Sequence, residues 1–239
     1  MSKRYAWNPQ DPPDDRALAA STFIDIESEI IAKTIDELID DSMSQRDIAV
    51  QLFNHVRDAV RYDPYRITLN QDEYRGSHSL ESKYGFCVPK AITYTTLLRA
   101  AGIPALLGFA DVTNHLSSEK LRAAVQSDVF VYHGYSVLWL DGKWLQATPT
   151  FNRSLSERAG VPVLEFDGYN DALLSPYDND GKLHMEYLND RGWHWDFDFE
   201  GMVDTFRAYY PHWFKSPSFH PAKYLDDTSD FEDDVERRS

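Results

Sequence analysis

Hydrophobic residues recur at helical spacing over two segments near the start of the chain. Between residues 21 and 41, apolar side chains return every three or four positions, from Phe23 to Ile39, which predicts a first helix. A second helix is predicted to begin after Ser44, a favoured N-cap residue, and to end before "YDPY". Residues 1–16 are polar and contain prolines, so we expect an irregular arm there.

A third helix is predicted directly after the only cysteine of the chain. Pro89 suits a first helical turn, where its missing N–H has no intrahelical partner, and an apolar stripe continues to Ala101. Gly102 followed by Pro104 is typical of a helix end. We therefore expect Cys87 at the N-terminus of a largely buried helix.

Less regular segments lie on both sides of this helix. Residues 66–83 lack periodicity, which predicts a long loop with a short turn around "SHSLESKYG". The run "PALLGFADV" predicts a buried strand, and residues 117–126 predict a short helix capped by Ser117.

Residues 128–151 form the clearest predicted hairpin. Asp141-Gly142 is a two-residue turn signal of type I′, with alternating apolar positions on both sides. If Leu140 faces Lys143, the remaining pairs follow, because side chains alternate between the two faces of a strand. One face then carries these polar side chains: His133, Tyr135, Gln146, Thr148 and Thr150.

The chain beyond residue 152 shows little periodicity. A helix is predicted at about residues 201–210, within an aromatic-rich stretch from Trp193 to Phe214 that we expect to pack over the core. The acidic residues 226–239 are expected to be disordered.

Composition restricts the classes of partner. The chain has 39 acidic and 24 basic residues and a net charge of −15, which repels phosphate backbones and excludes nucleic acid as a partner. No apolar run approaches a membrane span and no signal-peptide core is present, so we expect a cytoplasmic protein that does not enter membranes. A single cysteine excludes an internal disulfide and a multi-cysteine zinc site.

Cys87 and His133 together indicate thiol chemistry. The positive end of a helix dipole stabilises a thiolate, and a histidine on a sheet face can accept the thiol proton. Each residue alone is more often structural, since a lone cysteine is commonly an inert buried hydrophobe and a strand histidine commonly a packed one. A thiol site also needs a group that holds the second imidazole nitrogen.

Three motifs occur in the order typical of a known family. They are "VRDAVRYDPY", "GFCVPKAITYTTLLRAAGIPALLGF" and "HGYSVLWLDGKWLQATPTFN", within about residues 50–152. In these motifs the sequence resembles the transglutaminase-like superfamily, which is related in fold to papain-type cysteine proteases. The resemblance implies an α+β fold in which helices pack on an antiparallel sheet.

The resemblance also implies roles for particular residues. Cys87 matches the nucleophile of the family and His133 its general base. The third member is usually an aspartate two residues before a threonine, where this chain has Thr148, followed by Pro149 and Thr150. Because a neutral orienting group is tolerated in Cys-His-Asn sites, we hypothesise a Cys87–His133–Thr148 constellation.

Further residues are candidates for orienting His133 or contacting a substrate. They are Thr150, Asn152 and Tyr135, together with Asn114 and His115 from the predicted loop "FADVTNHLSS". The segment "SPYDNDGKLHMEY" resembles a calcium loop but lacks ligands at its first and twelfth positions. We expect no metal and no other cofactor.

The predicted organisation is a single compact domain. It has an N-terminal arm and helix at residues 1–43, a core at residues 44–152 and an aromatic-rich extension at residues 153–239. The predicted function is that of a thiol enzyme acting on amide bonds through a Cys thioester, by peptide or isopeptide hydrolysis or by acyl transfer to an amine. Its substrate would be a peptide or protein. The alternative is a catalytically silent scaffold that binds a peptide or protein partner, and the oligomeric state is left open.

Overall fold

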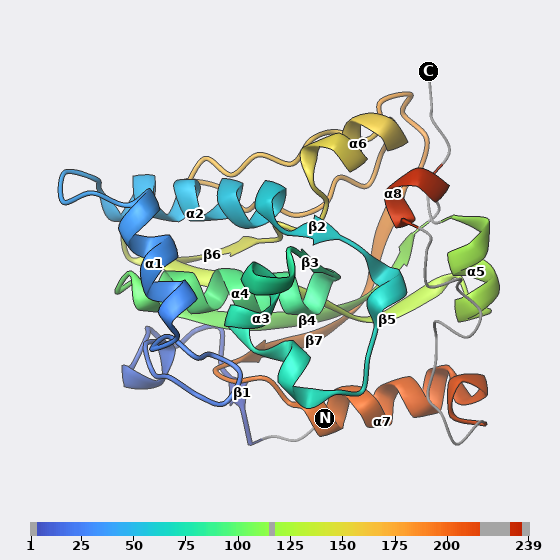
Figure 1. The fold of residues 1–239 in the computed structure, drawn as a ribbon, viewed down its shortest axis with the longest axis horizontal. Coiled ribbons are helices and arrows are strands. Elements are labelled where there is room, and N and C mark those ends of the chain that lie inside the picture. Colours follow the sequence, from blue (N-terminus) through green and yellow to red (C-terminus); the bar gives the residue numbers. More distant parts are fainter. Residues whose placement is uncertain (1–3, 115–117, 216–229, 236–239) are drawn as a thin grey trace.

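A five-stranded antiparallel sheet, ordered β1-β7-β4-β5-β6, forms the centre of the computed structural model, which describes residues 4–114, 118–215 and 230–235. Helices pack on one face of this sheet (Figure 1), which confirms the predicted α+β fold. The N-terminal arm packs on the other face through Trp7 and Ala17. The strands are β1 Ala6–Trp7, β4 Ala105–Asn114, β5 Val129–Leu140, β6 Lys143–Ala147 and β7 Met185–His194, and the short parallel pair is β2 Arg61–Tyr62 with β3 Tyr84–Gly85.

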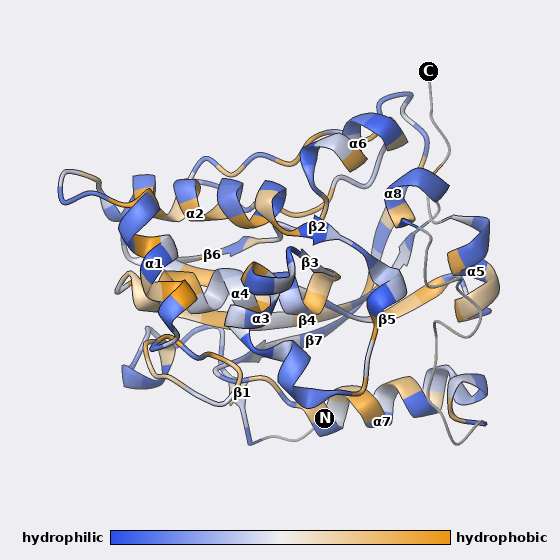
Figure 2. Ribbon diagram, viewed as in Figure 1, coloured by the Kyte–Doolittle hydropathy of each residue, from blue (hydrophilic) through white to orange (hydrophobic). Residues whose placement is uncertain are grey.

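The helices differ in length and in how they meet solvent. Hydrophobic and hydrophilic bands alternate along α2 and α7 in Figure 2, as expected for helices with one buried face. In the described part of the chain, none of the helices is long and apolar enough to cross a membrane. The α-helices are α1 Glu29–Leu38, α2 Gln45–Ala59, α3 Gly76–Ser82, α4 Cys87–Ala100, α5 Glu119–Val125, α6 Arg153–Ala159, α7 Phe199–Tyr209 and α8 Phe231–Asp234. The 3-10 helices are η1 Asp15–Ala17, η2 Pro64–Arg66, η3 Gln71–Tyr74 and η4 Pro211–Phe214.

Helix α4 lies between the sheet and the other N-terminal helices. It packs on β4 and β5 on one side and on α1, α2 and α3 on the other, and every residue from Val88 to Arg99 is buried. Its long polar side chains must therefore find hydrogen-bond partners inside the protein. The partners are backbone carbonyl oxygens: those of Arg57 and Val60 for Lys90, Gly76 for Thr93, Ala49 for Tyr94, and Ala19, Ala105 and Trp195 for Arg99.

The β5–β6 hairpin has the predicted turn and register. Asp141 and Gly142 have φ values of 48° and 83°, as a type I′ turn requires. Leu140 pairs with Lys143, and the ladder continues in the predicted register to the pair of Ser136 and Ala147. The two-residue turn signal between two apolar strands was therefore sufficient to place these residues.

The first helix begins later than its periodicity predicted. Helix α1 starts at Glu29, and the residues before it are irregular. The side-chain oxygen of Ser21 accepts hydrogen bonds from the backbone N–H groups of Phe23 and Ile24, which competes with helix formation. Both apolar residues are nevertheless buried. The apolar pattern at these positions therefore indicates buried side chains and not a helix.

Two other local predictions need correction. Residues 66–83 contain η3 and α3, so helix replaces much of the predicted loop. Helix α5 is capped by Ser118, whose side chain accepts a hydrogen bond from the backbone N–H of Leu121. The predicted cap, Ser117, lies outside the described residues.

The C-terminal extension supplies β7, a strand that the sequence pattern did not indicate. Strand β7 lies between β1 and β4, so the extension is part of the sheet as well as packed against it. Half of its residues are exposed, and its pairing with β4 shifts register twice, after Phe109 and after Asp111. Each bulge interrupts the alternation by which a strand is recognised in sequence.

Part of the acidic tail is folded, which corrects the prediction of disorder. Residues 230–235 include α8, and the buried ring of Phe231 packs edge-on against the rings of Tyr62 and Tyr65 at 5.5 and 5.3 Å. Arg61 forms ion pairs with Asp230 and Glu232. The charge pattern predicted disorder because it does not reveal one apolar anchor among acidic residues.

Replacing Phe231 by alanine is expected to lower the free energy of unfolding by about 2 to 4 kcal/mol, because truncating a buried phenylalanine removes contacts and leaves a cavity. Urea titration measures the change. The matched control is Asp233→Ala at a side chain that is 76% exposed, with an expected effect within about 0.5 kcal/mol. Equal stability of Phe231→Ala and the unmodified protein would contradict the packing of α8.

Candidate active site

Cys87 is the first residue of α4. Phe86 before it is extended, with φ −89° and ψ −170°, and Pro89 occupies the first turn, so the helix begins where the sequence predicted. The Cys87 side chain is partly exposed. The first N–H groups of a helix lack intrahelical partners, so the sulfur lies beside unpaired donors of α4.

His133 follows an irregularity in β5. Tyr132 has a positive φ of 65°, and the pairing of β4 with β5 shifts between Ala110 and Val112. Together these features describe a β-bulge with the extra residue in β5, immediately before His133. Such a bulge redirects the strand and so decides where the next side chain points.

Gly134 brings β5 against the first turn of α4. A Cβ atom at this position would lie 2.9 Å from the Cα of Val88 and 3.3 Å from the carbonyl oxygen of Cys87. Only glycine permits so close an approach of the strand to the helix backbone. The residue after His133 therefore touches the turn that carries Cys87, and the small residue in "HGY" was the sequence signal for this contact.

Cys87 and His133 line the same cavity. The volume of this cavity is about 60 Å³. Its walls come from the core, through residues such as Phe86 and Val112, and from the extension, through Phe206 and Trp213. The cavity thus exists only when the extension is folded onto the core.

The electrostatic environment keeps the pair neutral. Burial raises the pKa of the Cys87 thiol to about 11, although nearby backbone N–H groups of Gly134 and Val88 act in the opposite direction. Burial lowers the pKa of His133 to about 4. The helix N-terminus was expected to favour a thiolate, but desolvation outweighs it, so the resting pair is a thiol and a neutral imidazole.

Among the residues that the structure describes, no hydrogen bond holds the imidazole of His133. Its Nε2 atom is buried and has no partner within the described part of the chain. The ring lies edge-on to that of Tyr187, with centroids 5.9 Å apart. Between described residues, no hydrogen bond joins His133 to Cys87 or to Thr148.

Thr148 leaves the hairpin ladder before it reaches the level of His133. Its backbone N–H donates to the carbonyl oxygen of Ala172, and its hydroxyl is 2.7 Å from that of Thr150. Both threonines are buried, but of the two only Thr150 lines the cavity. The predicted shared face ends at this point, because the β5–β6 ladder stops at the pair of Ser136 and Ala147 and does not extend to residue 148.

The other candidate residues lie in different surroundings. Asn152 accepts a hydrogen bond from the N–H of Tyr62 and donates to Ser154 and Glu232, so its polar groups hold β2, α6 and α8 together. Asn114 lines the cavity. Tyr135 is buried over Gly108 on the opposite face of the sheet. His115 lies outside the described residues.

Asp111 stabilises the bulge before His133. It lies within β4, inside the predicted strand "PALLGFADV", and Oδ1 accepts a hydrogen bond of 3.1 Å from the N–H of Tyr132. Arg191 on β7 forms a bidentate pair with the same carboxylate at 2.5 and 2.9 Å. The sequence signal was a carboxylate within an apolar strand, and its partner could not be identified from the pattern.

The described ranges contain no group of three or more His, Cys, Asp or Glu side chains placed to hold a metal ion. The chemistry available at this cavity is that of the thiol, the imidazole and backbone N–H groups.

A family model matches the segment that contains the candidate site. Residues 32–149 match the family model of the transglutaminase-like superfamily, a segment that includes Cys87, His133 and Thr148. The chain contains a transglutaminase-like domain. At the level of the family, this supports a thiol enzyme.

Two solved structures are similar to this chain over part of their own length. A proposed cysteine protease from Cytophaga hutchinsonii matches with a TM-score of 0.43 and 15% identity, over 76% of this chain and 56% of that one. A proposed protease from Parabacteroides distasonis matches with a TM-score of 0.37 and 20% identity, over 66% and 32%. The chain thus spans about half and about a third of their lengths. No curated protein sequence matches.

The buried imidazole of the transglutaminase-like domain is expected to make stability depend on pH. Above the ordinary pKa of 6.5, His133 is neutral in both folded and unfolded chains. As the pH falls from about 6.5 to about 4, the unfolded chain takes up a proton that the folded chain does not, so the free energy of unfolding falls. For this residue the loss approaches about 3 kcal/mol.

Urea titrations between about pH 7.5 and about pH 4.5 on the unmodified protein and on His133→Gln measure this loss. The variant should show the smaller decline, since the other buried histidines are common to both proteins. Parallel pH dependence in the two proteins would contradict the depressed pKa of His133.

Replacing Asp111 by alanine is expected to cost about 3 to 5 kcal/mol, because it leaves the Arg191 guanidinium without its buried partner and the Tyr132 N–H without an acceptor. Asp111→Asn should cost less, since it keeps an oxygen for Tyr132. Chemical denaturation gives the stabilities, and the NMR shifts of the His133 ring report its orientation.

The matched control is Asp204→Ala, which breaks an exposed ion pair with Arg207. It should change stability by less than about 1 kcal/mol and leave the His133 shifts in place. If Asp111→Ala resembled this control in both measurements, the carboxylate would not stabilise the bulge.

Proposed function

We propose that the protein is a cysteine-dependent hydrolase of amide bonds in peptides, with Cys87 as nucleophile and His133 as general base. The observation that carries the proposal is that both side chains line one cavity, while Gly134 holds the strand of His133 against the turn of Cys87. The family match to a thiol-enzyme superfamily supports it at a coarser level.

At neutral pH the site pairs an unprotonated imidazole with a protonated thiol, and a base of pKa about 4 takes the proton of a thiol of pKa about 11 only as the sulfur attacks. Because the pKa of His133 is lowered to about 4, its imidazole is unprotonated at neutral pH and can accept the thiol proton. Because the pKa of Cys87 is raised to about 11, the thiol keeps its proton until the substrate arrives. Ionisation and nucleophilic attack therefore occur together, as they do for a serine hydroxyl.

The reaction follows from these states. The Cys87 sulfur bonds to the amide carbonyl carbon as its proton passes to His133, and the N-terminal N–H groups of α4 face the developing oxyanion. The C–N bond then breaks as His133 returns the proton to the leaving amine. Water, with His133 again as base, hydrolyses the thioester and releases a carboxylic acid.

The hydroxyls of Thr148 and Thr150 replace the usual third-position carboxylate in this proposal. Thr150 lines the cavity with His133, and its hydrogen bond with Thr148 makes the two hydroxyls one polar unit. Such a unit can orient an imidazole directly or through a water, but it adds no negative charge to stabilise the imidazolium. We therefore propose hydrolysis at a modest rate.

A silent binding scaffold is the second candidate. It is favoured by the raised pKa of Cys87 and by the unpartnered Nε2 atom of His133. In that case the cavity would bind a peptide without forming a thioester.

Intact-protein mass spectrometry after incubation with a library of acyl-peptide amides distinguishes the two. The chain has one cysteine, so a thioester appears as a single adduct that is absent from Cys87→Ala. His133→Gln should slow adduct formation by about 10²- to 10⁴-fold, whereas His55→Gln, a matched change on α2, should not. If no peptide in the library formed an adduct that Cys87→Ala lacks, the hydrolase would be rejected and the binding scaffold would be the remaining candidate.

A further inference from the structure

We propose that the cavity beside Cys87 binds an apolar side chain of the substrate, the one next to the scissile amide. This inference rests on the proposed function and adds the substrate class, a branched aliphatic or aromatic residue on the acyl side. It follows from the composition, the hydrogen bonding and the size of the cavity.

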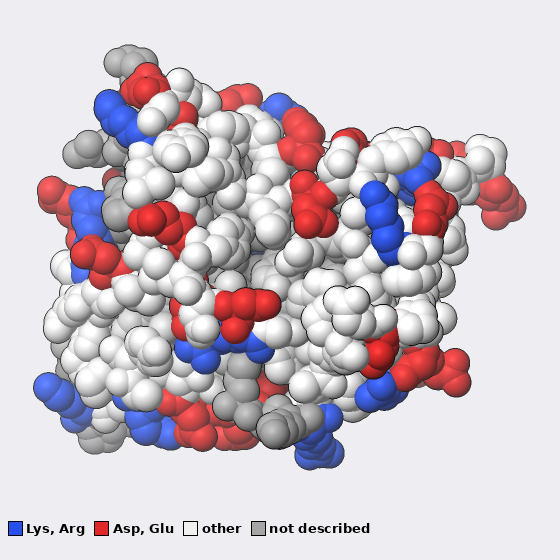
Figure 3. All heavy atoms as spheres, turned by 180° about the vertical axis from the view of Figure 1, so that it is seen from behind, with Lys and Arg blue, Asp and Glu red and all other residues white. Residues whose placement is uncertain are grey.

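The walls of the cavity carry no charge. The lining residues described contain no Asp, Glu, Lys or Arg, although the chain as a whole has a net charge of −15. Acidic and basic side chains are instead spread over the outer surface, as Figure 3 shows for one face. A charged substrate side chain would lose its hydration here and gain no counter-ion, so it is excluded.

The polar atoms of Tyr210 and Trp213, two of the aromatic residues that line the cavity, are already bonded within the protein. The hydroxyl of Tyr210 donates to the carbonyl oxygen of Val129 and accepts from the N–H of Val131, both at 2.8 Å. The indole N–H of Trp213 donates to the carbonyl oxygen of Ala124 at 2.8 Å. These side chains therefore offer a ligand their ring surfaces.

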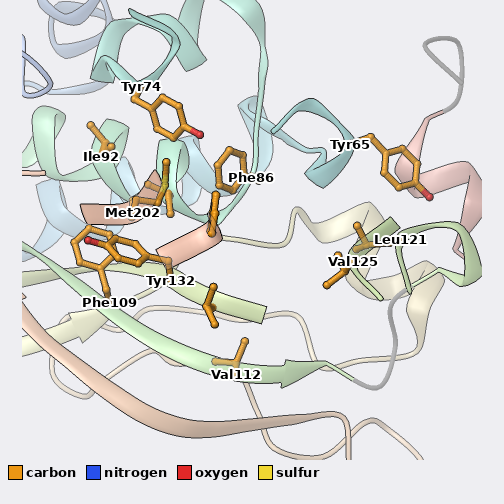
Figure 4. Close-up of a cluster of buried hydrophobic side chains, with 14 of the residues drawn as sticks. Tyr65, Tyr74, Phe86, Ile92, Phe109, Val112, Leu121, Val125, Tyr132 and Met202 are labelled. Carbon is orange, nitrogen blue, oxygen red and sulfur yellow. The ribbon is translucent and has the colours of Figure 1, made fainter. Parts of the chain in front are cut away.

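The cavity is large enough for a substrate side chain, and residues of both α4 and α5 line it. Its volume of about 60 Å³ is several times the roughly 10–15 Å³ that one water molecule needs. Leu121 and Val125 of α5 line it together with Phe86 and Cys87. Figure 4 shows Phe86 well apart from Leu121 and Val125. A side chain entering beside the sulfur would reach α5 and cover apolar surface along its length.

Hydrolysis of N-acetyl-aminoacyl-coumarin amides that differ only in the acyl residue tests the assignment. We expect kcat/KM for Leu and Phe to exceed that for Ala by about 10- to 100-fold, and Glu and Lys to fall below Ala. Turnover without such a preference would overturn the apolar subsite while leaving the proposed function intact.

A bulky side chain on α5 would fill the part of the cavity beside that helix. This tests whether the cavity selects the substrate side chain, separately from general effects on catalysis. Val125→Trp should reduce kcat/KM for Leu and Phe to about that for Ala. The matched control is Ala123→Trp, which adds the same ring at an exposed position of α5 and should keep the preference. If Val125→Trp does not fold, Leu121→Ala enlarges the cavity and should shift the preference from Leu towards Phe.

Binding provides a readout that does not need turnover. Trp213 lines the cavity, so N-acetyl-Leu-amide should alter tryptophan fluorescence saturably in the protein and in Cys87→Ala, but not in Val125→Trp. Binding without hydrolysis of any amide would support the subsite and reject the hydrolase. Equal binding of Leu and Glu amides would reject the subsite.

Discussion

The burial of α4 is the constraint on which the structure depends. A helix enclosed on all sides must satisfy every polar side chain internally, and here Lys90, Thr93, Tyr94 and Arg99 donate to main-chain carbonyl groups of the surrounding elements. These carbonyls belong to α2, α3, β4, the N-terminal arm and the segment after β7. The helix that carries Cys87 therefore forms hydrogen bonds to each of these elements. Loss of one of these bonds would leave a buried side chain or carbonyl group without a hydrogen-bond partner.

The same burial determines the chemistry of the site. Close packing around the helix N-terminus raises the pKa of Cys87, and packing of β5 lowers that of His133, so both groups rest uncharged. The strand can approach because residue 134 is a glycine, and His133 takes its direction from a bulge that Asp111 stabilises. Apolar walls thus oppose early ionisation of the thiol and at the same time favour an uncharged ligand.

The core of the fold could be predicted because its signals are local. The hairpin turn at Asp141-Gly142 defines its own register, and Pro89 and Gly102 mark the two ends of α4. Predictions failed where long-range contacts determine conformation. The bulged and exposed β7 is a strand because β4 pairs with it, and α8 is folded because Phe231 finds two tyrosine rings.

The sequence by itself determined the position of Cys87 at a helix N-terminus, through periodicity and turn residues, and it indicated the α+β class through the resemblance of its motifs to a known family. Only the tertiary structure decided the protonation of the pair, the separation of Thr148 from His133 and the walls of the cavity. Desolvation, bulges and cavities arise from atoms that are distant in sequence, so a local pattern does not contain them.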